Sequence, residues 1–151
     1  MSHRVEIKKI APDAMKAFGP LYQYVGASGL DRALVDMLYM RISQINGCAY
    51  CVDLHWRDAM KAGDDARKFN SIITWREAPF FSERERAALN WAESLTHVAD
   101  TGAPDADYDQ LKPHFSEKEI ADITVVIALM NAMNRIGIGQ RLAPPAKVAD
   151  R

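Results

Sequence analysis

The sequence lacks any excess of charge of one sign and any apolar run long enough to cross a bilayer. Its 19 Lys and Arg residues stand against 20 Asp and Glu residues, a formal net charge of -1, so bulk charge favours neither nucleic acid nor an anionic membrane. The longest uncharged stretch of the C-terminal half, residues 123–134, is shorter than the roughly 18 apolar residues of a membrane helix. We therefore expect no membrane and no nucleic acid as partners.

Signals for a secretory leader and for separate domains are also missing. The first 15 residues mix charged side chains with a few apolar ones and contain no signal-peptide core, which predicts a cytoplasmic protein. No low-complexity tract, repeat or long linker divides the chain. With 151 residues, 48% of them hydrophobic, we expect a single domain over residues 1–151, with its core at about residues 30–142 and a frayed or extended tail after Leu142.

Strand patterns are scarce, because β-branched residues rarely alternate with polar ones, and the fold class predicted is all-α. Ser82–Glu85 and Ser116–Glu119 have the pattern of a capping box and mark two helix starts. The helix after Ser116 is apolar nearly all round, so it must be covered by other helices or by a second subunit, and we expect a homo-oligomer. Arg41 falls within the apolar stripe of residues 34–45, where its guanidinium needs carboxylate or carbonyl partners.

Only two cysteines occur, Cys48 and Cys51. A structural disulfide is not expected in a reducing compartment, and so short a loop constrains the unfolded chain very little, so the pair indicates redox chemistry or metal binding. Asn46 and Gly47 favour the end of one helix, which places both cysteines in the first turn of the next. Free backbone N–H groups and the helix dipole lower the thiol pKa there, and a modest backbone adjustment closes a reversible disulfide.

His55 lies four residues after Cys51 and shares a helical face with both cysteines. Its ordinary pKa near neutrality suits it to accepting a thiol proton. The same three residues are also candidate zinc ligands, but the fourth ligand is missing and His97 and His114 lack ligand spacing. We therefore favour the redox interpretation and expect no bound metal.

The run from Arg41 to His55 resembles the core motif of AhpD-like alkylhydroperoxidases, within the carboxymuconolactone decarboxylase superfamily. Residues 81–89 are similar to the family's following helix start, and residues 133–135 to its late Asn-Arg element, so the resemblance covers most of residues 30–140. It implies an all-helical oligomeric peroxidase without a bound cofactor. In such an enzyme Cys51 attacks a hydroperoxide and becomes a sulfenic acid, Cys48 is the proton donor and resolving thiol, and His55 belongs to a proton relay.

The relay of this family usually includes a glutamate twelve residues before the first cysteine, and here that position is Asp36. Aspartate is shorter by one methylene, about 1.5 Å of reach. The helical phase places Asp36 on the side of Ser43, away from the apolar stripe, so it either reaches His55 through water or is a polar surface group. The resemblance also implies an external thiol reductant, either a thioredoxin-like or a lipoyl-bearing protein.

Three other functions fit parts of the sequence. A lactone decarboxylase is one, although members of the superfamily with that activity generally do without the CxxC pair. The others are a disulfide oxidoreductase that does not use peroxide and an oligomeric redox sensor without turnover. Trp56, Trp75 and Trp91 are interpreted as core in preference to a substrate pocket, and Tyr50 as part of the site wall or a subunit contact.

Overall fold

The computed structural model describes residues 4–146, which form helices and loops without a β-strand and so confirm the predicted all-α fold. Residues 1–3 and 147–151 of the predicted domain lie outside the described part. The helices are, in chain order, α1 (Ile7–Ile10), α2 (Pro12–Lys16), α3 (Phe18–Ala27), α4 (Arg32–Asn46), α5 (Ala49–Lys61), α6 (Ala66–Asn70), the 3-10 helix η1 (Ser71–Thr74), α7 (Glu83–Thr96), α8 (Val98–Thr101), α9 (Asp105–Asp109) and α10 (Glu117–Gly139).

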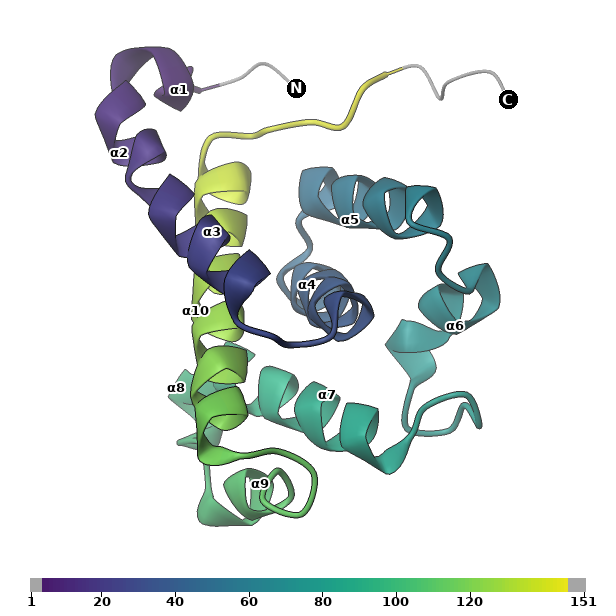
Figure 1. Cartoon of the computed structure of the whole chain (residues 1–151). Coiled ribbons are helices and arrows are strands. Elements are labelled where there is room, and N and C mark those ends of the chain that lie inside the picture. The colour runs from purple at the N-terminus through teal and green to yellow at the C-terminus, as the bar shows by residue number, and fades with distance from the viewer. Residues whose placement is uncertain (1–3, 147–151) are drawn as a thin grey trace.

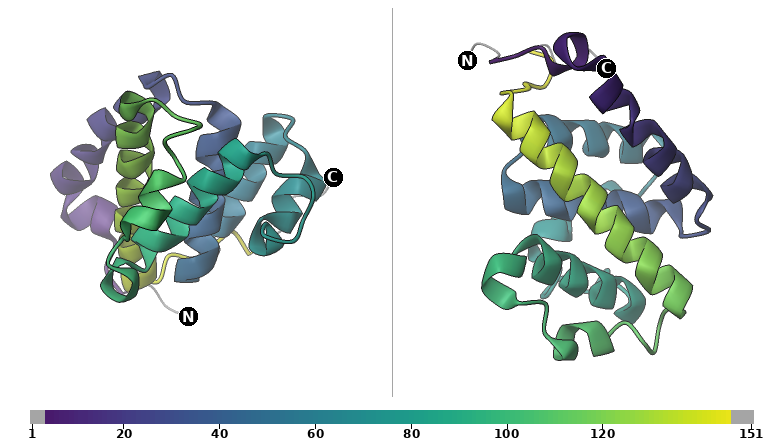
Figure 2. Two further views of the ribbon diagram at one scale, coloured as in Figure 1. Left: turned by 90° about the horizontal axis from the view of Figure 1, so that it is seen from below. Right: turned by 90° about the vertical axis from the view of Figure 1, so that its left-hand side faces the viewer.

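Helix α4 is the centre of the fold and packs against α5, α7 and α10 (Figure 1). In Figure 2, right, the long helix α10 crosses the stack formed by α5, α4 and α7. Met37, Leu38 and Ile42 of α4 are almost completely buried, as are Leu89 of α7 and Ile127 of α10. The predicted apolar stripe is therefore the innermost layer of the core.

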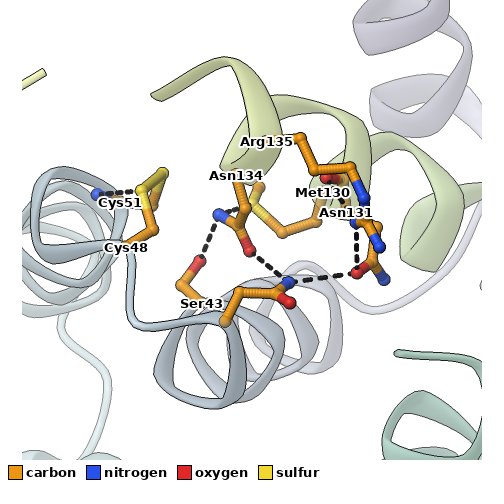
Figure 3. The surroundings of a disulfide bond; sticks show 8 residues. Ser43, Cys48, Cys51, Met130, Asn131, Asn134 and Arg135 are labelled. Carbon is orange, nitrogen blue, oxygen red and sulfur yellow. Dashed lines mark hydrogen bonds between the residues drawn. A yellow bond between two sulfur atoms is a disulfide. The ribbon is translucent and has the colours of Figure 1, made fainter. Parts of the chain in front are cut away.

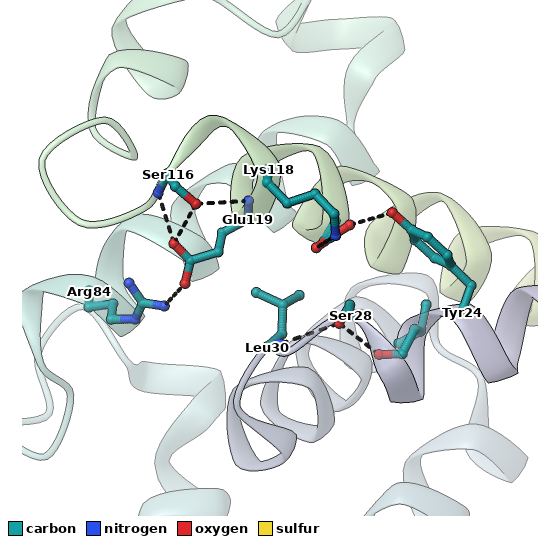
Figure 4. Close-up of polar contacts among 9 residues, drawn as sticks. Tyr24, Ser28, Leu30, Arg84, Ser116, Lys118 and Glu119 are labelled. Atoms are coloured by element: carbon teal, nitrogen blue, oxygen red, sulfur yellow. Dashed lines mark hydrogen bonds and ion pairs between the residues drawn. The ribbon is translucent and has the colours of Figure 1, made fainter.

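Both predicted capping boxes are present. At the start of α10, the Ser116 hydroxyl accepts a hydrogen bond from the Glu119 backbone N–H at 3.3 Å, and the Glu119 carboxylate accepts one from the Ser116 N–H at 2.8 Å (Figure 4). The Arg84 guanidinium of α7 donates to the same carboxylate at 2.6 Å. The Ser116 backbone N–H and then Arg84 lower the pKa of Glu119 to about 2, so this carboxylate stays charged and joins the two helices.

Arg41 has the carboxylate partner that its buried position predicts. Its Nε donates to Glu93 Oε1 of α7 at 2.7 Å, and the indole N–H of Trp75 donates to the same oxygen at 2.8 Å. Arg76 donates to Oε2 at 2.6 Å. Burial by itself raises the pKa of Glu93, but the hydrogen bonds from Trp75 and the two guanidinium groups outweigh it and leave the pKa below its usual value.

Helix α10 is, among residues 4–146, the one helix long and apolar enough to cross a membrane by length and composition. Half of its most apolar window is buried inside the protein. Its contacts with α3, α4, α5 and α7 are those of a core helix, which agrees with the prediction from its sequence.

The segments outside the helical core lie beside each other at one end of α10. The Arg4 backbone N–H donates to the Gln140 carbonyl at 3.4 Å, and its guanidinium donates to the Gly139 carbonyl at 3.2 Å. After α10, the Leu142 N–H returns to the Gly137 carbonyl at 2.9 Å, and residues 142–146 are not helical. This confirms the predicted extended tail as far as residue 146, and the rest of it lies outside the described residues.

Candidate active site

The turn between α4 and α5 places the two cysteines. Gly47 takes a left-handed conformation, with φ of 71°, which suits a residue without a β-carbon. The Cys48 N–H then donates back to the Ser43 carbonyl at 3.0 Å, and Cys48 becomes the N-cap of α5. Its sulfur accepts a hydrogen bond from the Cys51 N–H at 3.4 Å, so the predicted helix start is confirmed.

Cys48 and Cys51 are joined by a disulfide, with their Cα atoms 5.3 Å apart (Figure 3). The bond lies almost wholly under other residues, because Cys48 is only 2% and Cys51 only 6% exposed. The prediction that cysteines three residues apart at a helix start can form a disulfide is therefore confirmed.

Helix α10 covers the disulfide at Gly137. A β-carbon at this position would lie 3.2 Å from the Cys48 sulfur and 3.8 Å from the Cys51 sulfur. The first distance is shorter than ordinary van der Waals contact, so a glycine hydrogen lets the helix backbone approach the sulfur pair.

A network of side-chain amides fixes α10 in this place, one turn before Gly137 (Figure 3). The Asn134 amide donates to the Ser43 hydroxyl at 3.1 Å. The Asn46 amide donates to the side-chain oxygens of Asn134 at 2.9 Å and Asn131 at 3.0 Å. The end of α4, just before the cysteines, is thus tied directly to the helix that covers them.

His55 lies one turn after Cys51 on α5 and is only 8% exposed. Its ring centroid is 4.9 Å from that of Tyr39 on α4, with the two planes tilted by 42°. Burial lowers the pKa of His55 to about 4, and the Asp58 carboxylate opposes this shift only in part. The imidazole is therefore neutral at pH 7 and can accept a proton, but the pKa near neutrality expected from the sequence is wrong, and burial makes this histidine a weaker base than an exposed one.

A cavity of about 710 Å³ opens beside these residues. Its wall includes Cys51, but not Cys48, so the second cysteine of the pair is the one that a molecule in the cavity meets. Most of the lining is apolar or aromatic. The lining residues are Val5, Glu6, Ile7, Lys8, Met15, Tyr22, Asp36, Tyr39, Tyr50, Cys51, Leu54, His55, Asp58, Met130, Met133, Ile136, Gly137, Leu142 and Ala143.

Asp36 also lies on the cavity wall, with its side chain 17% exposed. Its carboxylate pairs with Arg32, whose guanidinium holds Asp64 through two hydrogen bonds of 2.6 and 2.9 Å. Burial raises the pKa of Asp36, and the Arg32 charge counteracts it. Among the described residues no direct hydrogen bond joins Asp36 to His55, so the structure brings the predicted relay residue to the same cavity but leaves its relay role a prediction.

The aromatic residues divide as the sequence predicts. Trp75 and Trp91 are buried, Trp56 packs on the core from outside, and none of the three lines the cavity. Tyr50 is part of the cavity wall, one of its two predicted places.

Across residues 4–146, no three or more His, Cys, Asp or Glu side chains come together in a way that could hold a metal ion.

Sequence reasoning missed Tyr39 and Gly137. Tyr39 stands in an apolar helix where a tyrosine looks like any core residue, and Gly137 stands near the end of a helix where glycine is common. One signal in the sequence indicates Tyr39 as a site residue: it lies one helical turn after Asp36 and therefore on the same side of the helix.

Residues 12–94 match the family model of the carboxymuconolactone decarboxylase family. The chain belongs to this family. The uncharacterized protein YdfG of Bacillus subtilis (strain 168) is 35% identical over 145 residues, which are 95% of this chain and 99% of YdfG. The uncharacterized protein YnjA of Escherichia coli (strain K12) is 31% identical over 108 residues, 72% of this chain and 59% of YnjA.

Solved structures show the same fold as this carboxymuconolactone decarboxylase family member. A protein of unknown function from Agrobacterium tumefaciens, provisionally assigned as the antioxidant defence protein AhpD, is 40% identical, with a TM-score of 0.93 over 97% of this chain and 100% of its own. The debrominase Bmp8 is 26% identical, with a TM-score of 0.78 over 89% of this chain and 73% of its own. The predicted AhpD-like fold is thus confirmed, and proteins with this fold include an enzyme of a different activity.

Proposed function

We propose that this protein is a thiol-dependent hydroperoxide reductase that cycles Cys51 through a sulfenic acid and a disulfide with Cys48. The observation that carries the proposal is the placement of the disulfide-bonded Cys51 on the wall of a large, mostly apolar cavity, next to a buried neutral His55. The AhpD-like fold supports it.

In the reduced protein, His55 accepts the Cys51 thiol proton, and the thiolate attacks one oxygen of the hydroperoxide. A sulfur–oxygen bond forms as the oxygen–oxygen bond breaks, and the leaving oxygen takes the proton from His55 and departs as an alcohol. With a pKa of about 4, His55 is a weak base for a thiol, so the imidazolium forms only while the negative charge of the Cys51 sulfur stabilises it, and it then gives up the proton readily. The Cys48 sulfur then displaces hydroxide from the sulfenic acid, its own thiol proton completes a water molecule, and the disulfide remains.

Completion of the cycle needs two electrons from a dithiol, which we propose to be a thioredoxin-like or lipoyl-bearing protein. The proposal also includes a homo-oligomer and a cytoplasmic location. Helix α10 supports an oligomer, because only half of its most apolar window is buried inside the protein.

The test treats the reduced protein with one equivalent of cumene hydroperoxide and follows the cysteines by mass spectrometry. We expect the loss of two hydrogen atoms in the wild type, no reaction in Cys51→Ser, and a dimedone-reactive sulfenic acid in Cys48→Ser. Asp36→Asn tests the relay against Asp53→Asn, the matched change at a carboxylate paired with Arg57 on α5 outside the cavity lining. Unmodified cysteines in the peroxide-treated wild type would refute the proposal.

A second candidate is reductive dehalogenation, in which the dithiol supplies two electrons, carbon exchanges bromine for hydrogen, and bromide and a proton are released. A cysteine-to-alanine variant of Bmp8 has been solved with 2,3,4-tribromopyrrole, at 25% identity to this chain and a TM-score of 0.81. The cavity beside Cys51 has room for a ring of this size. Bromide release from 2,3,4-tribromopyrrole by the reduced protein would support this candidate, and its absence would exclude that substrate.

A further inference from the structure

The burial and the contacts of Tyr39 indicate that this residue binds a ligand in the cavity. It lies on α4, is only 6% exposed, and lines the cavity together with Cys51 and His55. Its ring rests against the imidazole of His55, with the centroids 4.9 Å apart. The side chain is therefore held in place at the site by its ring.

The hydroxyl of Tyr39 is shielded from solvent and has no hydrogen-bond partner among residues 4–146. A buried hydroxyl without a partner is costly, and such groups are rare in folded proteins away from functional sites. The other unpartnered buried side-chain atoms, on Gln44 and Ser94, belong to residues outside the cavity lining. Burial also raises the pKa of Tyr39, so the hydroxyl keeps its proton and can act as a donor.

We propose that the Tyr39 hydroxyl donates a hydrogen bond to the leaving oxygen of the hydroperoxide while the Cys51 sulfur attacks the other oxygen. The inference rests on the proposed peroxidase function and adds a residue that contacts the reacting atoms. Its geometric basis is a hydroxyl without a partner on a residue of the wall that also carries the attacking sulfur. Because this hydroxyl is closed to water, the neighbouring side chains must shift slightly to open it to the peroxide.

The step balances without a proton from Tyr39. The Cys51 sulfur gains a bond to one oxygen, and the electron pair of the broken oxygen–oxygen bond goes to the other oxygen. That oxygen takes the proton that His55 received from the thiol, so a thiol and a hydroperoxide give a sulfenic acid and an alcohol. Tyr39 keeps its own proton and stabilises the negative charge that develops on the leaving oxygen.

This role predicts a dependence on the leaving group. A hydrogen bond to an alkoxide, which is strongly basic, contributes more to the transition state than one to a carboxylate, which carries its charge easily. Tyr39 should therefore matter most for alkyl hydroperoxides and least for peroxy acids. A residue that only supports the packing of His55 would affect both classes equally.

The experiment measures the single-turnover oxidation of the reduced full-length protein by cumene hydroperoxide and by perbenzoic acid. The test variant is Tyr39→Phe, which keeps the ring against His55 and removes only the hydroxyl. Tyr108→Phe is the matched control, because Tyr108 packs edge-on against Trp91 and does not line the cavity. Alkylation by iodoacetamide reports whether the Cys51 thiolate itself is unchanged.

We expect Tyr39→Phe to slow oxidation by cumene hydroperoxide about 10- to 100-fold, the worth of one hydrogen bond to a charged group. The loss with perbenzoic acid should be clearly smaller, and the alkylation rate should match the wild type. Equal losses with both oxidants, a parallel loss in alkylation, or a similar loss in Tyr108→Phe would overturn the inference. A wild type that both oxidants leave unreacted would instead refute the peroxidase function, and this inference with it.

Discussion

Replacement of His55 by asparagine should remove a defined part of the pH dependence of folding stability. In the unfolded chain the imidazole binds a proton below its ordinary pKa of 6.5, but in the folded protein only below about 4. Between these values the unfolded state holds more protons, so stability rises with pH from about 4 to 6.5 and is level above.

The size of this effect follows from the burial of the ring. Each tenfold change in proton affinity is worth about 1.4 kcal/mol, so the lowered pKa of His55 makes the wild type lose ~2 kcal/mol on going from neutral pH to pH 5, and ~3 kcal/mol by pH 4. Only 8% of the residue is exposed, so screening by solvent reduces the figure little. In His55→Asn this contribution is absent, and titrations common to both proteins cancel in the difference.

The assay is urea denaturation of the disulfide form between pH 4.5 and 7.5, with His97→Asn as the control at an exposed histidine. We expect the stability difference between wild type and His55→Asn to change by about 2.5 kcal/mol over this range. The His97→Asn protein reports the effect of the same substitution at the surface. Proton NMR of the four histidines gives a direct reading of their titration. Parallel stability curves, or a His55 resonance that titrates near pH 6.5, would refute the reasoning.

Two further predictions concern packing. Arg41→Met removes one of the two guanidinium partners of the half-buried Glu93 and should lower the free energy of unfolding by about 2 kcal/mol. Arg57→Met at an exposed pair should cost less than about 0.5 kcal/mol, and urea denaturation measures both. Gly137→Val places side-chain carbons against the disulfide and should lower the free energy of unfolding by about 1–3 kcal/mol more than Gly139→Val does. Gly139 is the control on the same helix, because a β-carbon there meets no atom of another element within 4 Å. Equal thermal stabilities of the two variants would contradict the close contact at Gly137.

The features that could be predicted are those that neighbouring residues decide. The serine and glutamate of a capping box are only three residues apart, so Ser82 and Ser116 mark their helix starts without knowledge of the fold. Asn46 and Gly47 in the same way fix where the helix before the cysteines ends. The disulfide and the place of His55 follow from helical spacing alone.

The features that could not be predicted depend on how separate helices approach each other. Gly137 is recognisable as a contact with the sulfur pair only once α10 is known to cross α5 there. Arg32 binds Asp64 as well as Asp36, and this bridge across 32 residues has no local pattern. Tyr39 lies in the site because the cavity opens on its side of α4. The periodicity of the sequence does not distinguish a helix face that borders a cavity from one that is buried in the core.

The covering of the sulfur atoms has a consequence for how electrons are delivered. Thiol–disulfide exchange requires an incoming sulfur in line with the bond that it breaks, and the cavity in front of Cys51 is walled by residues 5–8 and 142–143. A small dithiol fits into such a space, whereas these two terminal segments stand between the disulfide and a folded reductant. The ratio of reduction rates by small and macromolecular donors therefore measures how far these segments obstruct access to the disulfide.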